Sequence, residues 1–222
     1  MSIQSTIKEI TEKLPQGVKL VAVSKYHPAE MIQEAYKAGQ RIFGESHVQE
    51  LQTKVPTLPS DIEWHFIGHL QTNKIKYIAP YIHLIHAVDS LRLLQEINKQ
   101  AERNNRIIKV LLQLHVAQEE TKFGFTESEC DTLLENGEWR NMKNIEIAGI
   151  MCMASNVDDN EQIAHEFQRA HNYFVRIRNK FFADSPAFCE CSMGMSEDYP
   201  IAVENGSTMI RVGTKIFGPR SY

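Results

Sequence analysis

The chain has 222 residues, of which 42% are apolar and 23% charged, and its formal net charge is −4 at pH 7. This length suits one α/β barrel or two smaller domains, and the composition is ordinary for a soluble globular protein with a sizeable core. The small negative charge gives no electrostatic reason to expect nucleic acid or an anionic membrane as a partner. No apolar run is long enough to span a bilayer.

Residues 1–14 carry the charges of an amphipathic helix and lack the apolar segment of a signal peptide. The four cysteines are too few and too scattered for a disulfide framework. Together these features predict a reducing, cytoplasmic location.

Strand-like and helix-like segments alternate after this first helix. Near-continuous apolar runs predict eight strands, within residues 19–25, 41–46, 62–69, 82–90, 106–117, 145–154, 188–194 and 208–218. Apolar residues at helical spacing predict the helices between them, within residues 28–39, 48–55, 72–81, 91–104, 127–136, 160–182 and 196–206. Asp89-Ser90 can cap the helix that begins at residue 91.

This alternation indicates a parallel sheet whose outer face is covered by helices. An open, doubly wound sheet is an alternative, but eight strand–helix units in this length fit a closed barrel better. No linker rich in Pro, Gly or Ser divides the chain. We therefore predict the α/β class, as a single (β/α)8 TIM-type barrel domain over residues 1–222 with an extra N-terminal helix.

The carboxyl ends of barrel strands are where active sites form, so the residues that finish each strand are the candidates. Lys25 finishes the first strand. A position in the barrel mouth would remove water from its ammonium group and favour the free amine, which can attack a carbonyl. Schiff-base chemistry begins in this way. Position alone favours an ordinary surface lysine just past a strand, and the residues at the other strand ends favour the Schiff base.

Small and hydroxyl-bearing residues lie at the ends of the last two predicted strands: Ser192 and Gly194 end the seventh, and Gly213 and Thr214 lie in the late part of the eighth. In many barrels the loops after strands seven and eight hold a phosphate through backbone N–H groups. Small residues let the backbone approach the anion, and hydroxyl groups add donors. Glycines that serve only turns and packing would produce the same pattern.

Arg211 lies two residues before Gly213, so strand alternation points both residues into the barrel. A cation there is costly without a partner. A salt bridge to Glu45 or Asp89 would satisfy it, and so would a heteroaromatic nitrogen, which accepts a hydrogen bond. A lysine, a phosphate cup and this donor match the needs of pyridoxal phosphate. The same parts would also serve a Schiff-base aldolase acting on a phosphorylated sugar.

Seven segments together resemble the pyridoxal phosphate homeostasis protein family, which shares its barrel with the N-terminal domain of bacterial alanine racemase. They are LVAVSKYHP, FGESHVQE, WHFIGHLQTNK, HAVDS, KFGF, AGIMCMA and SMGMSEDYPIAVENGSTMIRVGTKIFG, in this order over nearly the whole chain. WHFIGHLQTNK and the last segment are highly specific. The resemblance makes a cofactor-free aldolase a remote alternative.

The resemblance implies a role for most of the candidate residues. Lys25 would hold pyridoxal 5'-phosphate (PLP) as a Schiff base, and Arg211 would face the pyridine nitrogen. Ser192, Gly213 and Thr214 would hold the phosphate. An arginine does not protonate the ring near pH 7, so the cofactor would be a weaker electron sink than beside a carboxylate.

Two positions depart from the family pattern. Ser46-His47 stands where the family usually has Asn-Tyr, and we count Ser46 among the cofactor-binding residues in place of that amide. His69 stands where the family usually has a proline, and we expect it to be a tolerated loop change.

The function that the resemblance implies is reversible PLP binding that buffers or delivers the cofactor inside the cell and so affects amino-acid and keto-acid balance. PLP-dependent apo-enzymes are candidate recipients, and a monomer without robust catalytic activity is expected. A weak PLP-dependent racemase or transaminase is the alternative, because it would use the same binding residues.

We predict no metal site. His65 and His69 would share a strand face, but the sequence assigns no further ligands to them. Cys189 and Cys191 have the wrong spacing for a zinc or redox pair, and strand alternation would place both on one face as buried small side chains.

Overall fold

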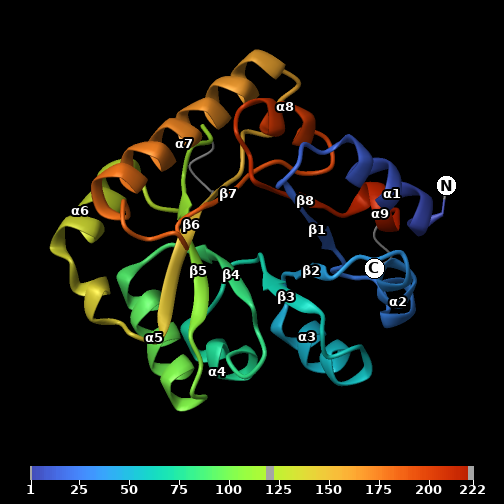
Figure 1. Ribbon diagram of the computed structural model, residues 1–222, viewed down its shortest axis with the longest axis horizontal. Coiled ribbons are helices and arrows are strands. Elements are labelled where there is room, and N and C mark those ends of the chain that lie inside the picture. Colours follow the sequence, from blue (N-terminus) through green and yellow to red (C-terminus); the bar gives the residue numbers. More distant parts are fainter. Residues whose placement is uncertain (1, 119–122, 220–222) are drawn as a thin grey trace.

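The computed structural model describes residues 2–118 and 123–219, and its eight parallel strands close into a barrel (Figure 1). Each strand pairs with the next along the chain, and the last returns to pair with the first. The strands are β1 (Lys19–Val23), β2 (Ile42–Glu45), β3 (Glu63–Phe66), β4 (Leu84–Val88), β5 (Ile108–Leu114), β6 (Ile145–Cys152), β7 (Glu190–Ser192) and β8 (Met209–Val212). The predicted α/β barrel is confirmed.

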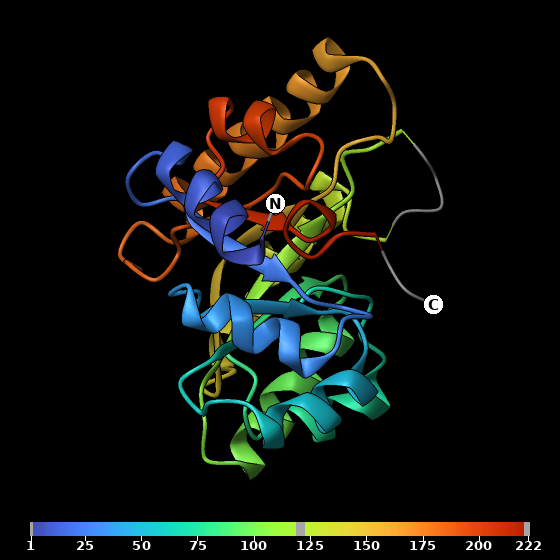
Figure 2. The same cartoon turned by 90° about the vertical axis from the view of Figure 1, so that its right-hand side faces the viewer.

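Helices cover the outside of the barrel (Figures 1 and 2). They are α1 (Ile3–Lys13), α2 (Ala29–Lys37), α3 (Val48–Lys54), α4 (Ile75–Ile78), α5 (Leu91–Arg103), α6 (Glu127–Asn136), α7 (Asn160–Phe181), α8 (Tyr199–Glu204) and α9 (Thr214–Phe217). The helix α1 is the predicted extra N-terminal helix, and it packs against α2 and α9. As predicted, Ser90 caps α5, since its hydroxyl accepts a hydrogen bond from the Leu93 N–H at 3.3 Å.

Strand alternation divides the apolar residues into two layers. Outward-facing residues such as Ala22, Phe43 and Phe66 are fully or almost fully buried against the helices. Inward-facing residues form a smaller cluster in the lumen, made up of Val21, Leu84, Ala87, Leu111, Ala148, Met151 and Met209. The barrel is therefore a packed core, and a binding site can open only at its ends.

The last strand is shorter than the sequence predicts. It ends at Val212, and Thr214–Phe217 form the helix α9. Ile216 and Phe217 are buried in this helix, and four residues are too few for a helical period to be recognised in the sequence. Gly213 and Thr214 consequently lie in the turn at the mouth, just beyond β8.

The expectation that Cys189 and Cys191 share a buried face is wrong. Cys191 lies in β7 and is buried, whereas Cys189 precedes the strand and is exposed. The strand β7 begins only at Glu190, so Cys189 lies outside it.

The segment KFGF begins at Lys122, which lies outside the described residues. Within residues 2–118 and 123–219, no helix combines the length and apolar character needed to cross a bilayer.

We expect Gly149→Ala to destabilise the barrel strongly. Ala148 is an extra residue in β6, because Val110 pairs with Ile147 but Leu111 pairs with Gly149. This bulge brings Gly149, at a φ of +153°, so close to β7 that an added Cβ would overlap the Glu190 carbonyl oxygen. The substitution should lower the free energy of unfolding by about 3 kcal/mol or more, as measured by urea denaturation.

The control is Gly39→Ala. Gly39 also has a positive φ, +96°, but an added Cβ would meet nothing within 4 Å. Only the cost of the left-handed backbone, about 1–2 kcal/mol, should appear there. Equal losses in the two variants would refute the steric explanation.

Candidate functional site

A cavity of about 390 Å³ opens at the carboxyl end of the barrel. Its size lies within the range of about 300–1,000 Å³ that is usual for small-molecule sites. The ends of β1 and β8 line it, together with the segments that follow β1, β2, β3, β6, β7 and β8: Val23, Lys25, His27, Ser46, Ile67, Met153–Asn156, Met195–Asp198, Arg211, Gly213 and Thr214. Five of the six residues selected from the sequence therefore meet at one cavity. Ser192 is the exception.

Lys25 comes two residues after the end of β1 and is half-buried at the cavity wall. On its N-terminal side, Ser24 is buried and its N–H donates to the Gly44 carbonyl of β2 at 3.0 Å. On its C-terminal side, Tyr26 has a φ of +67°, which turns the chain away from the strand direction. The lysine thus lies at a sharp corner, and its neighbours determine where the side chain points.

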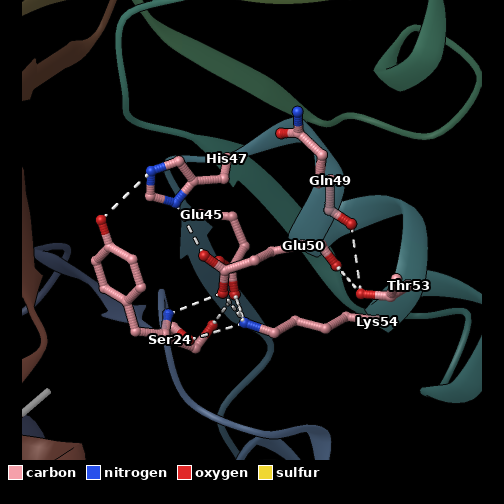
Figure 3. Close-up of polar contacts among 8 residues, drawn as sticks. Ser24, Glu45, His47, Gln49, Glu50, Thr53 and Lys54 are labelled. Atoms are coloured by element: carbon pink, nitrogen blue, oxygen red, sulfur yellow. Dashed lines mark hydrogen bonds and ion pairs between the residues drawn. The ribbon is translucent and has the colours of Figure 1, made fainter. Parts of the chain in front are cut away.

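A buried ion pair supports the residue before Lys25 (Figure 3). The Lys54 ammonium group lies 2.8 Å from Glu45 Oε1, and both side chains are almost fully buried. The Ser24 hydroxyl donates to the same carboxylate oxygen at 2.7 Å, and Lys54 donates to the Ser24 carbonyl at 3.0 Å. Every polar group of Ser24 is therefore tied to β2 or α3.

A second carboxylate supports the residue after Lys25. Glu50 accepts a hydrogen bond from the Tyr26 N–H at 2.8 Å and pairs with Lys54 at 2.6 Å. The His47 ring lies 2.9 Å from its other oxygen (Figure 3). The backbone on both sides of Lys25 is consequently attached to one cluster, formed by Glu45, Glu50 and Lys54.

The sequence interpretation did not select this cluster. The spacing of Glu50 and Lys54, four residues apart on one helix, is a signal that could have indicated a pair. The sequence could not indicate Glu45 as a member of the cluster, because it lies in β2 and its partner Lys54 lies in α3.

The two carboxyl groups of the cluster have opposite pKa shifts. Burial raises the pKa of Glu45 to about 7, and Lys54 and Ser24 oppose this only in part. Its Oε2 is also buried without a hydrogen-bond partner among the described residues. Burial pushes the pKa of Glu50 upward too, but hydrogen bonds from Lys54, Tyr26 and His47 outweigh it and the pKa falls. Glu50 is therefore the ionised partner of Lys54 near neutral pH.

Arg211 projects from β8 into the cavity and is almost fully buried. Its Nη1 donates to Ser192 Oγ at 2.7 Å, and its Nη2 donates to the Cys152 carbonyl at 2.9 Å. The salt bridge to Glu45 or Asp89 considered above is wrong, since Glu45 pairs with Lys54 and Asp89 with His69. Neutral acceptors hold the guanidinium, which leaves it able to donate to a ligand.

Ser192 lies beneath the cavity and begins a buried polar chain. Its hydroxyl oxygen is 3.1 Å from His86 Nδ1, and His86 Nε2 is 3.0 Å from His65 Nδ1. Burial lowers the pKa of both imidazoles well below the usual value, so both rings are neutral. The chain runs from Arg211 through Ser192 and His86 to His65, inside the barrel. Ser192 therefore supports Arg211, and its hydroxyl does not line the cavity.

Ser196 takes the position on the cavity that the sequence interpretation gave to Ser192. The Gly213 N–H donates to Ser196 Oγ at 3.3 Å, which brings the loop after β7 against the turn after β8. A Cβ added to Gly213 would lie 3.0 Å from the Val23 carbonyl oxygen, so a glycine lets this turn approach β1. Ser196, Gly213 and Thr214 together form an end of the cavity that carries hydrogen-bond donors, and Glu197 and Asp198 follow Ser196 in the same lining.

The two unusual positions noted in the sequence have different surroundings. Ser46 lines the cavity, and the neighbouring His47 contacts Glu50 and the ring of Tyr26. His69 lies outside the cavity lining, where it pairs with Asp89 at 3.5 Å and stacks on Phe123.

We expect Glu45→Gln to change how stability depends on pH. Because burial raises the pKa of Glu45 from 4.5 to about 7, the folded state binds more protons than the unfolded state between these values. The stabilising contribution of this group is complete below pH 4.5 and is lost as the pH rises through about 7. Glutamine keeps an acceptor for Ser24 and Lys54 but does not titrate.

The check is urea denaturation of both proteins between pH 4.5 and 8. The free energy of unfolding of the unchanged protein should fall with rising pH relative to that of Glu45→Gln. Parallel pH curves would show that Glu45 is ionised throughout and would contradict the expectation.

Comparisons with known proteins agree with this geometry. The family model described as alanine racemase, N-terminal domain, matches residues 1–221. The pyridoxal phosphate homeostasis protein of Vibrio alginolyticus is 38% identical over 236 residues, with 100% of this chain and 99% of that protein covered. The human protein of the same name is 34% identical over 244 residues, with coverage of 100% and 88%.

Solved structures of the same family and of alanine racemase share the fold of this chain. PipY of Synechococcus elongatus PCC7942 with PLP bound superposes with a TM-score of 0.87 at 34% identity, covering 98% of this chain and 100% of that chain. The alanine racemase of Clostridium difficile 630 has a TM-score of 0.76 at 16% identity and is covered over 57% of its length, which shows a shared fold only. The chain belongs to the pyridoxal phosphate homeostasis protein family, whose barrel is that of the alanine racemase N-terminal domain.

Proposed function

We propose that this chain binds PLP reversibly through Lys25 and takes part in the intracellular homeostasis of that cofactor. The observation that carries the proposal is that Lys25, Arg211 and the donor-bearing turn at Gly213 and Thr214 open into one cavity. An amine can react with the aldehyde of PLP, a guanidinium can donate to its pyridine nitrogen, and hydroxyl and backbone N–H groups can bind its phosphate. The likeness to PipY with PLP bound supports the same ligand.

The residues present fit this cofactor. Lys25 would form the Schiff base, and Arg211 would donate a hydrogen bond to the ring nitrogen while Ser192 and the Cys152 carbonyl hold its other N–H groups. Ser196, Gly213 and Thr214 would hold the phosphate with neutral donors, and Ser46 would contact the cofactor from the β2 side. We assign the phosphate contact to Ser196 in place of Ser192, because the Ser192 hydroxyl is engaged by Arg211 and His86.

Arg211 also favours a carrier over a catalyst. Bound PLP supplies an electron sink for carbanion chemistry, and that sink is weaker when the ring nitrogen is not protonated. A guanidinium donates a hydrogen bond and keeps its proton near pH 7. In this proposal the chain is a monomer in the cytoplasm that releases PLP to apo-enzymes.

Proton exchange separates this role from that of a weak racemase or transaminase. The PLP-loaded protein is incubated with a panel of amino acids in deuterated water, and loss of the α-proton is followed by NMR. Exchange at turnover rates would establish the enzymatic alternative and refute the carrier role.

We expect Lys25→Ala to abolish covalent cofactor binding. The purified variant should lack the visible absorbance of the Schiff base, and borohydride reduction should leave no pyridoxyl group on the protein. Lys37→Ala, which removes an exposed lysine from α2, is the control and should keep both signals. A Lys25→Ala spectrum identical to that of the unchanged protein would disprove the proposed anchor.

We expect the two serines to differ in what they recognise. Ser196→Ala should raise the Kd for PLP about ten- to a hundredfold, roughly 1.4–2.8 kcal/mol, because one hydrogen bond to a charged group is lost. Its Kd for pyridoxal, which has no phosphate, should stay unchanged. Ser192→Ala should weaken both ligands to a similar degree, because it loosens Arg211.

Fluorescence titration with PLP and with pyridoxal measures these four constants. If Ser192→Ala weakened PLP but not pyridoxal, and Ser196→Ala did not, the result would show that Ser192 contacts the phosphate.

A further inference from the structure

Three side chains with metal-binding atoms meet at the amino-terminal end of the barrel, opposite the cavity. Glu63 is the first residue of β3, His65 lies two residues later on the same strand face, and His83 immediately precedes β4. Their ligand atoms all lie within 4.8 Å of one another. His83 Nε2 is 3.5 Å from Glu63 Oε2, and the rings of His65 and His83 are nearly parallel, with centroids 5.7 Å apart.

One ring nitrogen of the buried His65 side chain has no hydrogen-bond partner among the described residues. The His65 side chain is 2% exposed, and this nitrogen is its Nε2. Its Nδ1 is already engaged by His86 at 3.0 Å, so Nε2 is the atom left for the cluster. A buried polar atom without a partner is uncommon, and a ligand at this position would satisfy it.

The polar chain beneath His65 allows this nitrogen to bind a cation. A metal at Nε2 requires the proton on Nδ1, which then donates to His86 Nε2, and His86 Nδ1–H in turn donates to Ser192 Oγ. The Ser192 oxygen has two lone pairs, so it accepts this bond together with the one from Arg211. Metal-bound histidines are commonly oriented by such a bond from the other ring nitrogen.

Glu63 and His83 are more exposed than His65 and would supply the movable ligands of an ion. Their side chains are 45% and 40% exposed, so they can move toward an ion while His65 remains in place. One carboxylate and two imidazoles form a ligand set typical of Zn²⁺, and the solvent-facing side leaves a fourth position for water. The surrounding cations include Lys19, Arg106 and Lys109, and Lys19 is paired with Glu190.

We propose that Glu63, His65 and His83 form a binding site for a divalent transition-metal ion of the zinc class. The site lies at the end of the barrel away from Lys25, and it does not depend on the cofactor proposal. Glu63 supplies a carboxylate oxygen, His65 its Nε2 and His83 a ring nitrogen, with water completing the coordination.

Co²⁺ is the probe for this site, because its visible bands report coordination by nitrogen and oxygen ligands. The full chain, free of any histidine tag and treated with a chelator, is titrated with Co²⁺ and then challenged with Zn²⁺. We expect bands that saturate at one ion per chain and disappear when Zn²⁺ displaces the probe. The Lys25→Ala variant should give the same titration, which separates this result from failure of PLP binding.

Three variants locate the ion. His83→Ala and Glu63→Gln change half-exposed side chains, so both should fold, and each should weaken binding at least about tenfold because a direct ligand is lost. His165→Ala removes an exposed histidine from α7 and is the matched control that should bind as the unchanged protein does. Circular dichroism verifies folding in each case.

Three results would overturn the proposal. One is the absence of saturable bands in the unchanged protein. Another is unchanged binding in His83→Ala and Glu63→Gln. The third is an equal loss in His165→Ala, which would identify the binding as adventitious attachment to surface histidines.

Discussion

The pairing of β8 with β1 is the constraint on which the site depends. It places Val21 beside Arg211 and Ala22 beside Val212, and so brings the first and last strands of the barrel into register. Lys25 and the Gly213 turn follow directly from these paired segments and therefore reach the same mouth. An open sheet with the same strands would leave them at opposite edges, with no shared cavity.

Two polar clusters serve this mouth in different ways. The cluster of Glu45, Glu50 and Lys54 lies on the β2–α3 side and holds the backbone around Lys25, with one ionised carboxylate and one whose pKa is near 7. The Arg211 guanidinium donates to a chain of neutral groups inside the barrel, formed by Ser192, His86 and His65. Buried polar groups are costly when incomplete, so each cluster favours one arrangement of its side chains. The second also connects the cavity with the opposite end of the barrel.

Part of the fold and part of the candidate site could be predicted from the sequence. The barrel and the placement of Lys25, Ser46, Arg211, Gly213 and Thr214 at strand ends followed from apolar runs and from the rule that such ends form sites. The placement of Ser192 beneath the cavity did not follow, because strand seven ends at Ser192 and the direction of its side chain depends on Arg211. The extent of the last strand was also wrong, because α9 is a single helical turn.

We could predict the order of strands and helices, the residue types at the strand ends and the family from the amino-acid sequence alone. The elements follow from the spacing of apolar residues, because helices and strands have fixed geometric periods. The chemistry at the strand ends and the family follow from the residue types themselves. The partners of the buried side chains depend on the closed barrel, where Glu45 pairs with Lys54, Ser192 with Arg211, and His65 with His86. Such contacts join residues from different elements, and the burial that shifts their pKa values exists only after the barrel has closed.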